Sequence, residues 1–358
     1  MKISKRFRRS TLELTVFLLL LLDHAWWRTG MISWGAVGYF VGGYLWYRRE
    51  ARLNARASEA VRNALTLTSI KDIERTYSRR DDYNTPEKRA LVRPPLDRHF
   101  YHQRYTEVQR LLDTFAREAH TVLDVGCGFG INTAYVGGTL GRRAVGIDVD
   151  SIKLSAARDR WGEGQGREER GCCTFVCADA AQPPFRAGTF DCILMTEVLE
   201  HLLSPEDGLK ACRTLLRDGG WLIITTPGSH NLNYSNNPLV VAEKVLSLIS
   251  DRVLPPYHNL HAEREFDWRK PEPQYGIHYH FSRQELDALL HRSGFESIMH
   301  RSFEFEIYPY LLIEFLTGGT MEGISRWVSP MEYLLQSIPW VNHLGQHLLW
   351  AARKQPRR

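Results

Sequence analysis

The stretch that decides the fold is Val122-Leu-Asp-Val-Gly-Cys-Gly-Phe-Gly130, in which a short apolar run leads into three alternating glycines. A glycine has no Cβ, so its backbone can adopt positive φ angles and lie close to a ligand. Residues 131–136 then begin a helix, and a glycine-rich turn between a strand and a helix is typical of nucleotide-binding sites. The stretch therefore predicts a strand, a ligand-binding turn and a helix.

The spacing of these glycines indicates which ligand is bound. A dinucleotide fingerprint needs glycine or alanine at position 131, where this chain has Ile131, and an acidic residue such as Asp124 is foreign to that fingerprint. An NAD-dependent oxidoreductase is therefore disfavoured. Asp148 ends the next apolar run, 18 residues after Gly130, and a carboxylate at a strand end is placed to accept hydrogen bonds from both ribose hydroxyls.

Strand-like and helical segments alternate through the middle of the chain. The predicted strands cover residues 121–125, 144–148, 172–177, 190–196 and 221–227, and helices are expected between them, including one at residues 204–216. This order predicts an α/β domain with a doubly wound parallel sheet whose ligand lies at the carboxyl ends of the strands. Glu197, Glu200 and His201 directly follow the fourth strand.

On these residues the chain resembles class I methyltransferases that use S-adenosylmethionine (SAM), whose first motif is an acidic residue followed by G-x-G-x-G. The resemblance extends over residues 121–227, and residues 190–227 are most similar to ubiquinone-pathway O-methyltransferases. It implies a Rossmann-like sheet of seven strands, with SAM as the cofactor. The cofactor-binding residues that it implies are Asp124, Gly126, Gly128, Gly130, Asp148, Asp179 (toward the adenine amino group) and Glu197 (toward the methionine part).

Methyl transfer to an oxygen atom usually needs a base. His201 is the leading candidate because it follows the strand that ends at the switch point of the sheet, and Glu197 is the second catalytic candidate. A histidine that only supports the helix start is an equal alternative for His201. Glu200, His278 and His280 are further candidates for the base.

A divalent metal is the less favoured alternative at the same residues. If the segment is helical, Glu197, Glu200 and His201 share one face and could bind Mg²⁺ or Mn²⁺, with His278 or His280 completing the site. This pattern resembles the metal site of small-RNA 2′-O-methyltransferases. The metal-free interpretation is preferred, because the motif also occurs in metal-free members of the family, and no metal ligand is assigned.

The N-terminal 48 residues are expected to anchor the protein in a membrane through one or two transmembrane helices. Apolar runs cover residues 11–22 and 30–47, and the second has no formal charge and would extend about 27 Å as a helix, close to the thickness of a bilayer core. Basic clusters flank the pair on both sides. By the positive-inside rule both flanks, and with them the catalytic domain, face the cytoplasm.

The remaining segments complete the predicted organisation. A basic connector covers residues 49–104, the methyltransferase domain residues 105–308 with a lid or substrate-binding insertion at 228–276, and an apolar, aromatic extension residues 309–358. The last two strands are expected near Ile298 and at residues 303–308. The aromatic residues of the extension are expected to cover the substrate pocket or to rest on the bilayer.

The charge is divided unevenly along the chain. The net charge is +5, but residues 1–104 hold 20 Lys and Arg against 10 Asp and Glu, a net of +10, so the remainder has −5. A negative catalytic portion disfavours nucleic acid as a partner. The six cysteines lack the spacing of a zinc site or of a secreted disulfide framework, which indicates a reducing compartment.

The sequence therefore predicts a membrane-associated SAM-dependent methyltransferase that acts on a small-molecule or lipid-like acceptor, at oxygen. Two alternatives stay open. The first is a sugar, glycan or RNA ribose O-methyltransferase with a metal site. The second is a non-catalytic membrane-anchored scaffold that binds SAM, against which the intact Asp124 and Asp148 weigh. The oligomeric state is not determined by the sequence.

Overall fold

The computed structural model describes residues 41–42, 44–45, 95–162, 173–202, 204–229, 260–265, 274–305, 313, 316–317, 320–339 and 341–356. The predicted hairpin at residues 11–47 lies outside this part of the chain apart from four positions, and so does most of the connector. Among the described residues, no helix has both the length and the hydropathy needed to cross a membrane. The membrane anchor therefore stays a prediction.

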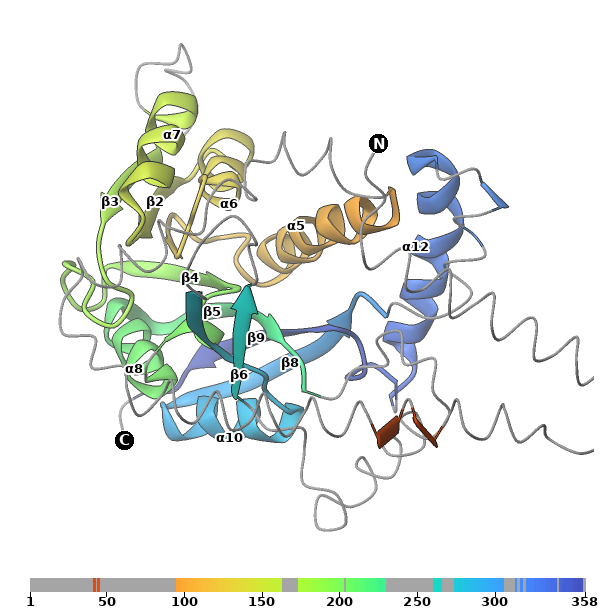
Figure 1. The fold of residues 1–358 in the computed structure, drawn as a ribbon. Helices are drawn as coiled ribbons and strands as arrows, with labels where there is room; N and C mark the ends of the chain where they lie inside the picture. Colours follow the sequence, from red (N-terminus) through yellow and green to blue (C-terminus); the bar gives the residue numbers. More distant parts are fainter. Residues whose placement is uncertain are drawn as a thin grey trace, which may run out of the picture.

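The domain is built on one sheet of seven strands (Figure 1). The strands are β1 (Thr121–Val125), β2 (Arg143–Asp148), β3 (Cys173–Cys177), β4 (Phe190–Thr196), β5 (Leu216–Pro227), β8 (Phe295–Phe303) and β9 (His347–Lys354). Their order is β3-β2-β1-β4-β5-β9-β8. Strands β1 to β5 pair in parallel, whereas β9 is antiparallel to both neighbours. The predicted seven-stranded Rossmann-like sheet is confirmed, but the sheet is mixed rather than wholly parallel.

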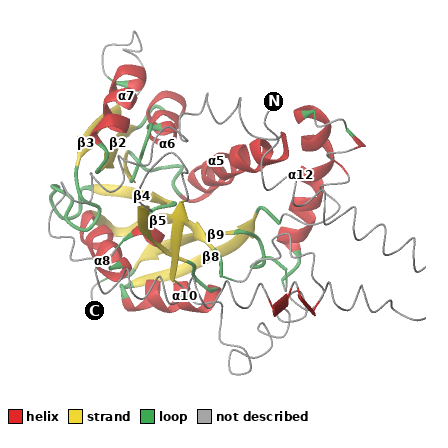
Figure 2. Cartoon of the chain, viewed as in Figure 1, coloured by secondary structure: helices red, strands yellow, loops and turns green. Residues whose placement is uncertain are grey.

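Helices cover both faces of this sheet (Figure 2). They are α5 (Pro95–Phe115), α6 (Ile131–Ala134) with the π-helical turn η1 (Tyr135–Thr139), α7 (Ser151–Trp161), the 3₁₀ turn η2 (Leu199–His201), α8 (Pro205–Leu215), α10 (Arg283–Arg292) and α12 (Met321–Ser337). Within the predicted insertion, β6 (Leu260–Glu265) and β7 (Gln274–Tyr279) form a separate antiparallel pair.

Alternate residues of the strands supply the two cores. Leu123 and Ile193 are fully buried on the face covered by α8 and α10. Their neighbours Val122 and Leu194 are buried on the opposite face, against α5 and α7. Successive side chains of a strand point to opposite faces of the sheet, so strands that are apolar on both faces must be covered on both faces.

Local capping chemistry explains where the predicted helices begin. Ser282 and Glu285 form a capping box at the start of α10, with each side chain bonded to the backbone N–H of the other residue. The Ser204 side chain accepts a hydrogen bond from the backbone of Asp207 at the start of α8. Helix α8 therefore begins where the sequence predicts a helix, at residues 204–216.

The prediction for the end of the sheet was right for β8, which contains Ile298, and wrong for the second strand of the pair. The last strand pair is β8 with β9, and β9 comes from residues that the sequence assigned to an extension beyond the domain. Trp350, expected to cover a pocket or to touch lipid, is 1% exposed in the middle of this strand. Pairing between β5 and β9 is a long-range contact, which no local sequence pattern specifies. The helix between β8 and β9, α12, packs on α5 through Phe100, Ile324 and Val328.

Candidate active site

The glycine loop between β1 and α6 has the conformation that the sequence predicts. Gly126, Gly128 and Gly130 have φ angles of 67°, 53° and 72°. A Cβ at Gly126 would lie 2.2 Å from the Val198 side chain, so this glycine is closely packed from behind. A Cβ at Gly128 would have no contact closer than 4.0 Å, to the Lys153 side chain. The middle of the loop is therefore open for the close approach of a ligand.

Asp148 lies at the end of β2 and contacts this loop. Its Oδ2 accepts a hydrogen bond from the Gly128 backbone N–H at 2.8 Å, and its Oδ1 accepts one from Asp150 N–H at 2.9 Å. Burial raises the pKa of Asp148. The structure thus brings the carboxylate next to the open glycine, while its predicted contact with a ribose stays a prediction.

Asp124 is more deeply buried and holds the loop from the strand side. Its Oδ2 accepts hydrogen bonds from the backbone N–H and the hydroxyl of Thr133, at 3.1 and 2.7 Å. Its Oδ1 is buried without a hydrogen-bond partner. Burial raises the pKa of Asp124 to about 7. Through these two hydrogen bonds Asp124 connects the end of β1 to the start of α6.

Asp179 lies just beyond β3, where its Oδ1 accepts a hydrogen bond from Ala181 N–H at 2.8 Å. This contact closes a local turn and accounts for an acidic residue at this position. The adenine contact that the family resemblance implies for Asp179 stays a prediction.

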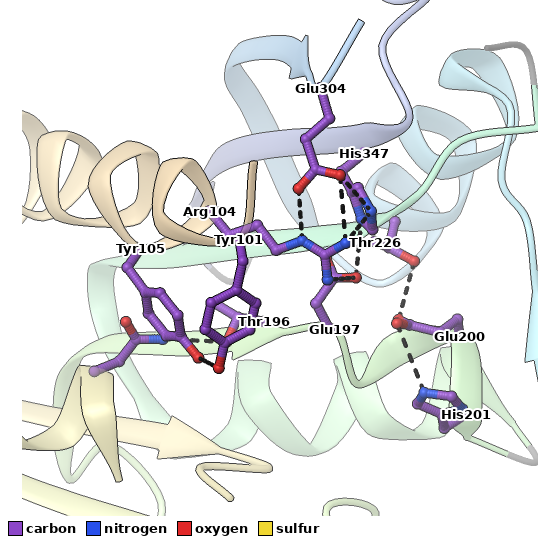
Figure 3. Close-up of polar contacts among 11 residues, drawn as sticks. Tyr101, Arg104, Tyr105, Thr196, Glu197, Glu200, His201, Thr226, Glu304 and His347 are labelled. Carbon is purple, nitrogen blue, oxygen red and sulfur yellow. Dashed lines mark hydrogen bonds and ion pairs between the residues drawn. The ribbon is translucent and has the colours of Figure 1, made fainter. Parts of the chain in front are cut away.

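Glu197 follows β4 and belongs to a buried charge cluster that the sequence did not predict (Figure 3). Its Oε2 lies 3.4 Å from Arg104 Nη1 and 2.9 Å from His347 Nδ1. Its Oε1 is buried without a hydrogen-bond partner. Burial acts to raise the pKa of Glu197, but His347 and Arg104 together hold that pKa below its ordinary value.

Arg104, from α5, is the centre of this cluster. Its Nε donates to Glu304 Oε1 at 2.7 Å, and its Nη2 lies 3.4 Å from Glu304 Oε2 and 2.6 Å from His347 Nε2. Glu332, from α12, accepts hydrogen bonds from the backbone N–H groups of Glu304 and Phe305. Four segments far apart in the chain therefore meet at one guanidinium.

The sequence contained no signal for this cluster. Arg104, Glu304 and His347 are single residues without motif spacing, and two of them lie beyond the part of the chain that carries the family motifs. Arg104 is the last residue of the predicted basic connector, and nothing in that segment singled it out. The partners depend on the position of β9, which the sequence misplaced.

Glu200 and His201 lie in the short turn η2 and point away from the Arg104 cluster (Figure 3). Glu200 Oε2 accepts a hydrogen bond from the Thr226 hydroxyl at 3.1 Å, and Glu200 Oε1 lies 3.8 Å from His201 Nε2. Burial raises the pKa of Glu200 well above its ordinary value, and the charge of Glu197 adds to this effect. The side chain of His201 is 23% exposed, so it is partly open to solvent.

The arrangement differs from the one that a metal site at these residues would need. Glu197 has a φ of 56° and precedes η2, so it does not share a helical face with Glu200 and His201. Among the described residues, no group of three or more His, Cys, Asp and Glu side chains is suited to hold a metal ion. The side chain of His278 lies outside the described part of the chain, whereas His280 is partly buried.

Comparison with protein families identifies the class of protein. A family model described as a methyltransferase domain matches residues 100–300, more than half of the chain. The chain belongs to this methyltransferase family, and the class I SAM-dependent methyltransferase predicted from the motifs is confirmed.

Curated relatives include two ubiquinone biosynthesis O-methyltransferases. The protein from Albidiferax ferrireducens is 39% identical over 132 residues, which cover 36% of this chain and 49% of that protein. The human mitochondrial protein is 32% identical over 128 residues, covering 36% and 34%. Norajmaline N-methyltransferase of Rauvolfia serpentina is 28% identical over 144 residues, covering 40% and 48%. The chain thus spans half or less of the length of these relatives.

Solved structures with a similar chain path include a SAM-dependent methyltransferase from Methanosarcina mazei. The TM-score is 0.47 and the sequence identity 18%, with 69% of this chain and 98% of that chain covered.

The described residues fit SAM as the cofactor. Gly128 leaves the loop open, Asp148 lies beside it, and Asp124 and Glu197 each have one buried oxygen without a hydrogen-bond partner. Carboxylates suit a ligand with a positively charged sulfonium and ammonium. When bound, SAM supplies the methyl group that is transferred.

Proposed function

We propose that this enzyme transfers the methyl group of SAM to an oxygen atom of a small-molecule or lipid-like acceptor, with His201 as the general base. The likeness to ubiquinone biosynthesis O-methyltransferases is the observation that carries the proposal. It favours an oxygen acceptor over nitrogen or carbon, although one matched relative is named as an N-methyltransferase.

The position of His201 supports its role as the base. It follows β4, the strand next to the one that carries the glycine loop, so its imidazole lies at the carboxyl edge of the sheet. A base must reach the proton of the acceptor, and a partly exposed side chain at this edge meets that condition. The buried Glu200 accepts a hydrogen bond from the Thr226 hydroxyl through Oε2, and its Oε1 lies 3.8 Å from His201 Nε2, close enough to favour the protonated form of a base.

The test begins with the acceptor. Membrane lipids and metabolites are incubated with isotope-labelled SAM and the full-length protein in detergent, and labelled products are identified by mass spectrometry. We expect the label on an oxygen atom of a small or lipid-like molecule. A label on nitrogen or carbon would overturn the assignment of the acceptor atom.

The same assay tests the base. His201→Ala should lower kcat by roughly 10² to 10⁴-fold, while the affinity for S-adenosylhomocysteine stays within about twofold of wild type, because the base acts on the acceptor. His120→Ala is the control, since His120 is exposed at the start of β1, at the opposite edge of the sheet. A wild-type rate in His201→Ala would exclude His201 as the base.

Membrane attachment through residues 1–48 is the second part of the proposal, and it rests on the two apolar runs and the flanking basic clusters. The full-length protein should stay in the pellet after a carbonate wash. A cysteine placed beside Arg28 should react with an impermeant reagent in intact cells, because both flanks are expected in the cytoplasm. Release by carbonate would disprove the anchor.

A further inference from the structure

Helix α12 has apolar residues on two sides, and the domain buries only one of them. The packed side holds Ile324 and Val328, which are fully buried against α5. On another side of the helix, Trp327 and Leu334 are 59% and 62% exposed. Pro330 is also exposed, and the spacing of three and four residues places it in line with these two. Trp327, Pro330 and Leu334 therefore form one exposed stripe along the helix, which we call the α12 stripe.

Exposed hydrophobic side chains gather around this stripe. Eight large hydrophobic residues are exposed in the described part of the chain, and half of them lie within residues 316–334. These four are Leu316, Trp327, Tyr333 and Leu334. Single exposed apolar residues are normal on a protein surface, whereas a group of them marks a site of contact with another protein or with a membrane.

The position of α12 favours a membrane as the partner, because the segment that leads from the predicted anchor joins the domain beside it. Helix α5 begins at Pro95, and His99 in its second turn has its Nδ1 3.0 Å from Ser325 Oγ on α12. Figure 1 shows the start of α5, in orange, beside α12. Trp327 follows Ser325 by only two residues. The stripe thus lies at the corner of the domain where the connector ends.

The charges near the stripe suit an anionic bilayer surface. Residues 49–94, which precede α5, hold 11 Lys and Arg against 7 Asp and Glu. Arg326 is exposed beside Trp327, and the Arg110 guanidinium lies 5.3 Å from the centre of the Tyr333 ring. Basic residues attract anionic headgroups, and Trp and Tyr rings prefer the boundary between headgroups and acyl chains. A helix with this combination lies in the plane of the interface.

We propose that the α12 stripe lies in the interface of the bilayer to which residues 1–48 attach the protein. The proposal rests on the membrane attachment proposed above and adds a second contact, which fixes the orientation of the catalytic domain. Helix α12 and its neighbour α5 then form the side of the domain that faces the membrane. Because α5 also carries Arg104, which contacts Glu197 after β4, this orientation turns the carboxyl edge of the sheet toward lipid. A lipid-like acceptor can then reach the site from the membrane.

The experiment measures how close the stripe lies to lipid. The full-length protein is reconstituted into vesicles of phosphatidylcholine and phosphatidylglycerol, with or without lipids that carry a nitroxide near the top of one acyl chain. A fluorescent probe is attached to a cysteine introduced by Leu334→Cys or Pro330→Cys, and the nitroxide quenches it only at short range. We expect strong quenching at both positions. The protein without an introduced cysteine gives the background from the native thiols.

Two matched controls separate the stripe from the rest of the surface. Ser329 is exposed on the same helix but, at 3.6 residues per turn, lies about 140° around the axis from Leu334. Ile152 is 68% exposed on α7, which lies on the other side of the domain from α12 (Figure 1). Quenching at Leu334 should exceed that at either control about twofold or more, because only the immersed face of an interfacial helix reaches the acyl boundary.

Trp327→Glu, combined with the probe at Leu334, tests whether the apolar stripe is what holds α12 at the interface. A carboxylate there must stay hydrated and is repelled by anionic lipid, so quenching should fall about twofold or more. Ile152→Glu adds the same charge away from the stripe and should leave quenching unchanged. Calorimetric titration with S-adenosylhomocysteine checks that each variant keeps its folded site, and Trp327→Ser replaces Trp327→Glu if the latter does not fold.

The outcomes distinguish this contact from the anchor. Equal quenching at Leu334, Ser329 and Ile152, in a protein that carbonate leaves in the pellet, would overturn the α12 contact and keep the anchor. Strong quenching at Leu334 in a protein that carbonate releases would support the contact and disprove the anchor. Unchanged quenching in the folded Trp327 variant would also overturn the proposal. So would quenching of the Leu334 probe by a nitroxide on a second copy of the chain, because the stripe would then be covered by protein.

Discussion

Two groups of carboxylates lie at the same edge of the sheet, and the two groups are stabilised by different kinds of contact. Asp124 and Asp148 flank the glycine loop and accept hydrogen bonds from groups no more than 20 residues away in the chain. Glu197 and Glu304 instead share Arg104, which comes from a helix far away in the sequence. In the first group the positive φ angles belong to glycines, and in the second they belong to the carboxylates themselves.

The glycine loop and the Arg104 cluster both contain residues with positive φ angles, and each accommodates these angles in a different way. A loop that must lie against a ligand can use glycine, which adopts positive φ without steric cost. A carboxylate needed at a comparable position cannot be replaced by glycine, so its strained backbone has to be stabilised by the surroundings. The partly buried Arg104 and the buried His347 are that support, and removing Arg104 should affect stability more than a change in the loop.

The largest expected effect is on stability in Arg104→Met. Removing the guanidinium leaves Glu304, which is almost fully buried, and Glu197 without their cation, and breaking a buried pair costs about 3 to 5 kcal/mol. We expect about 3 kcal/mol, because 27% of the Arg104 side chain is exposed. Thermal or denaturant unfolding measures this. The double variant with Glu304→Gln should regain part of the loss, and no recovery would contradict the electrostatic explanation.

A smaller effect is expected in the loop, where Gly126→Ala and Gly128→Ala form a matched pair. Both place a Cβ at positive φ, which costs about 1 to 2 kcal/mol. Only at Gly126 does the new atom strike Val198, and because the struck atom is a terminal methyl group this adds about 1 kcal/mol of overpacking, the lower end of the usual range. Unfolding and calorimetric titration with SAM should both show the larger loss for Gly126→Ala. Equal losses in the two variants would mean that the contact with Val198 adds nothing to the cost of the substitution at Gly126.

A pH-dependent effect is expected from Asp124→Asn. Burial raises the pKa of Asp124 from 3.8 to about 7 in the folded state, so the folded protein binds this proton more tightly than the unfolded chain. The stabilisation is present at low pH and is lost as the pH rises from about 4 to 7, by at most about 1.4 kcal/mol per pH unit. Asparagine cannot ionise, so the Asp124→Asn variant should not lose stability in this way as the pH rises.

Unfolding curves across this range provide the measurement. The stability of Asp124→Asn relative to wild type should rise between about pH 4 and 7 and then level off. Asp218→Asn removes a carboxylate that is 72% exposed and serves as the control. A difference between Asp124→Asn and wild type that does not change with pH would contradict the raised pKa.

The smallest effect is expected on removal of divalent metal. Arg104 and His347 already contact Glu197, and Glu197 points away from Glu200 and His201 (Figure 3). Exhaustive chelation should therefore change the rate on the eventual acceptor by less than about twofold, or about 0.4 kcal/mol. Loss of activity that Mg²⁺ or Mn²⁺ restores would show that Glu197 leaves Arg104 to bind a metal ion.

The sequence by itself determined the parts of the molecule that depend on neighbouring residues. The strand before Gly126, the positive φ angles of the loop and the capping box at Ser282 follow from the conformational freedom of glycine and from hydrogen bonds within one helical turn. The same local alternation of strands and helices was enough to predict the parallel half of the sheet, with Asp148 beside the loop.

Only the tertiary structure decided the other half of the site. The position of β9 between β5 and β8 depends on which sheet edge remains available after the parallel strands have paired, and side-chain periodicity does not contain this information. Arg104, Glu304 and His347 meet because that strand is there. Contacts between distant segments depend on the whole fold, so the residues that hold Glu197 could be found only in three dimensions.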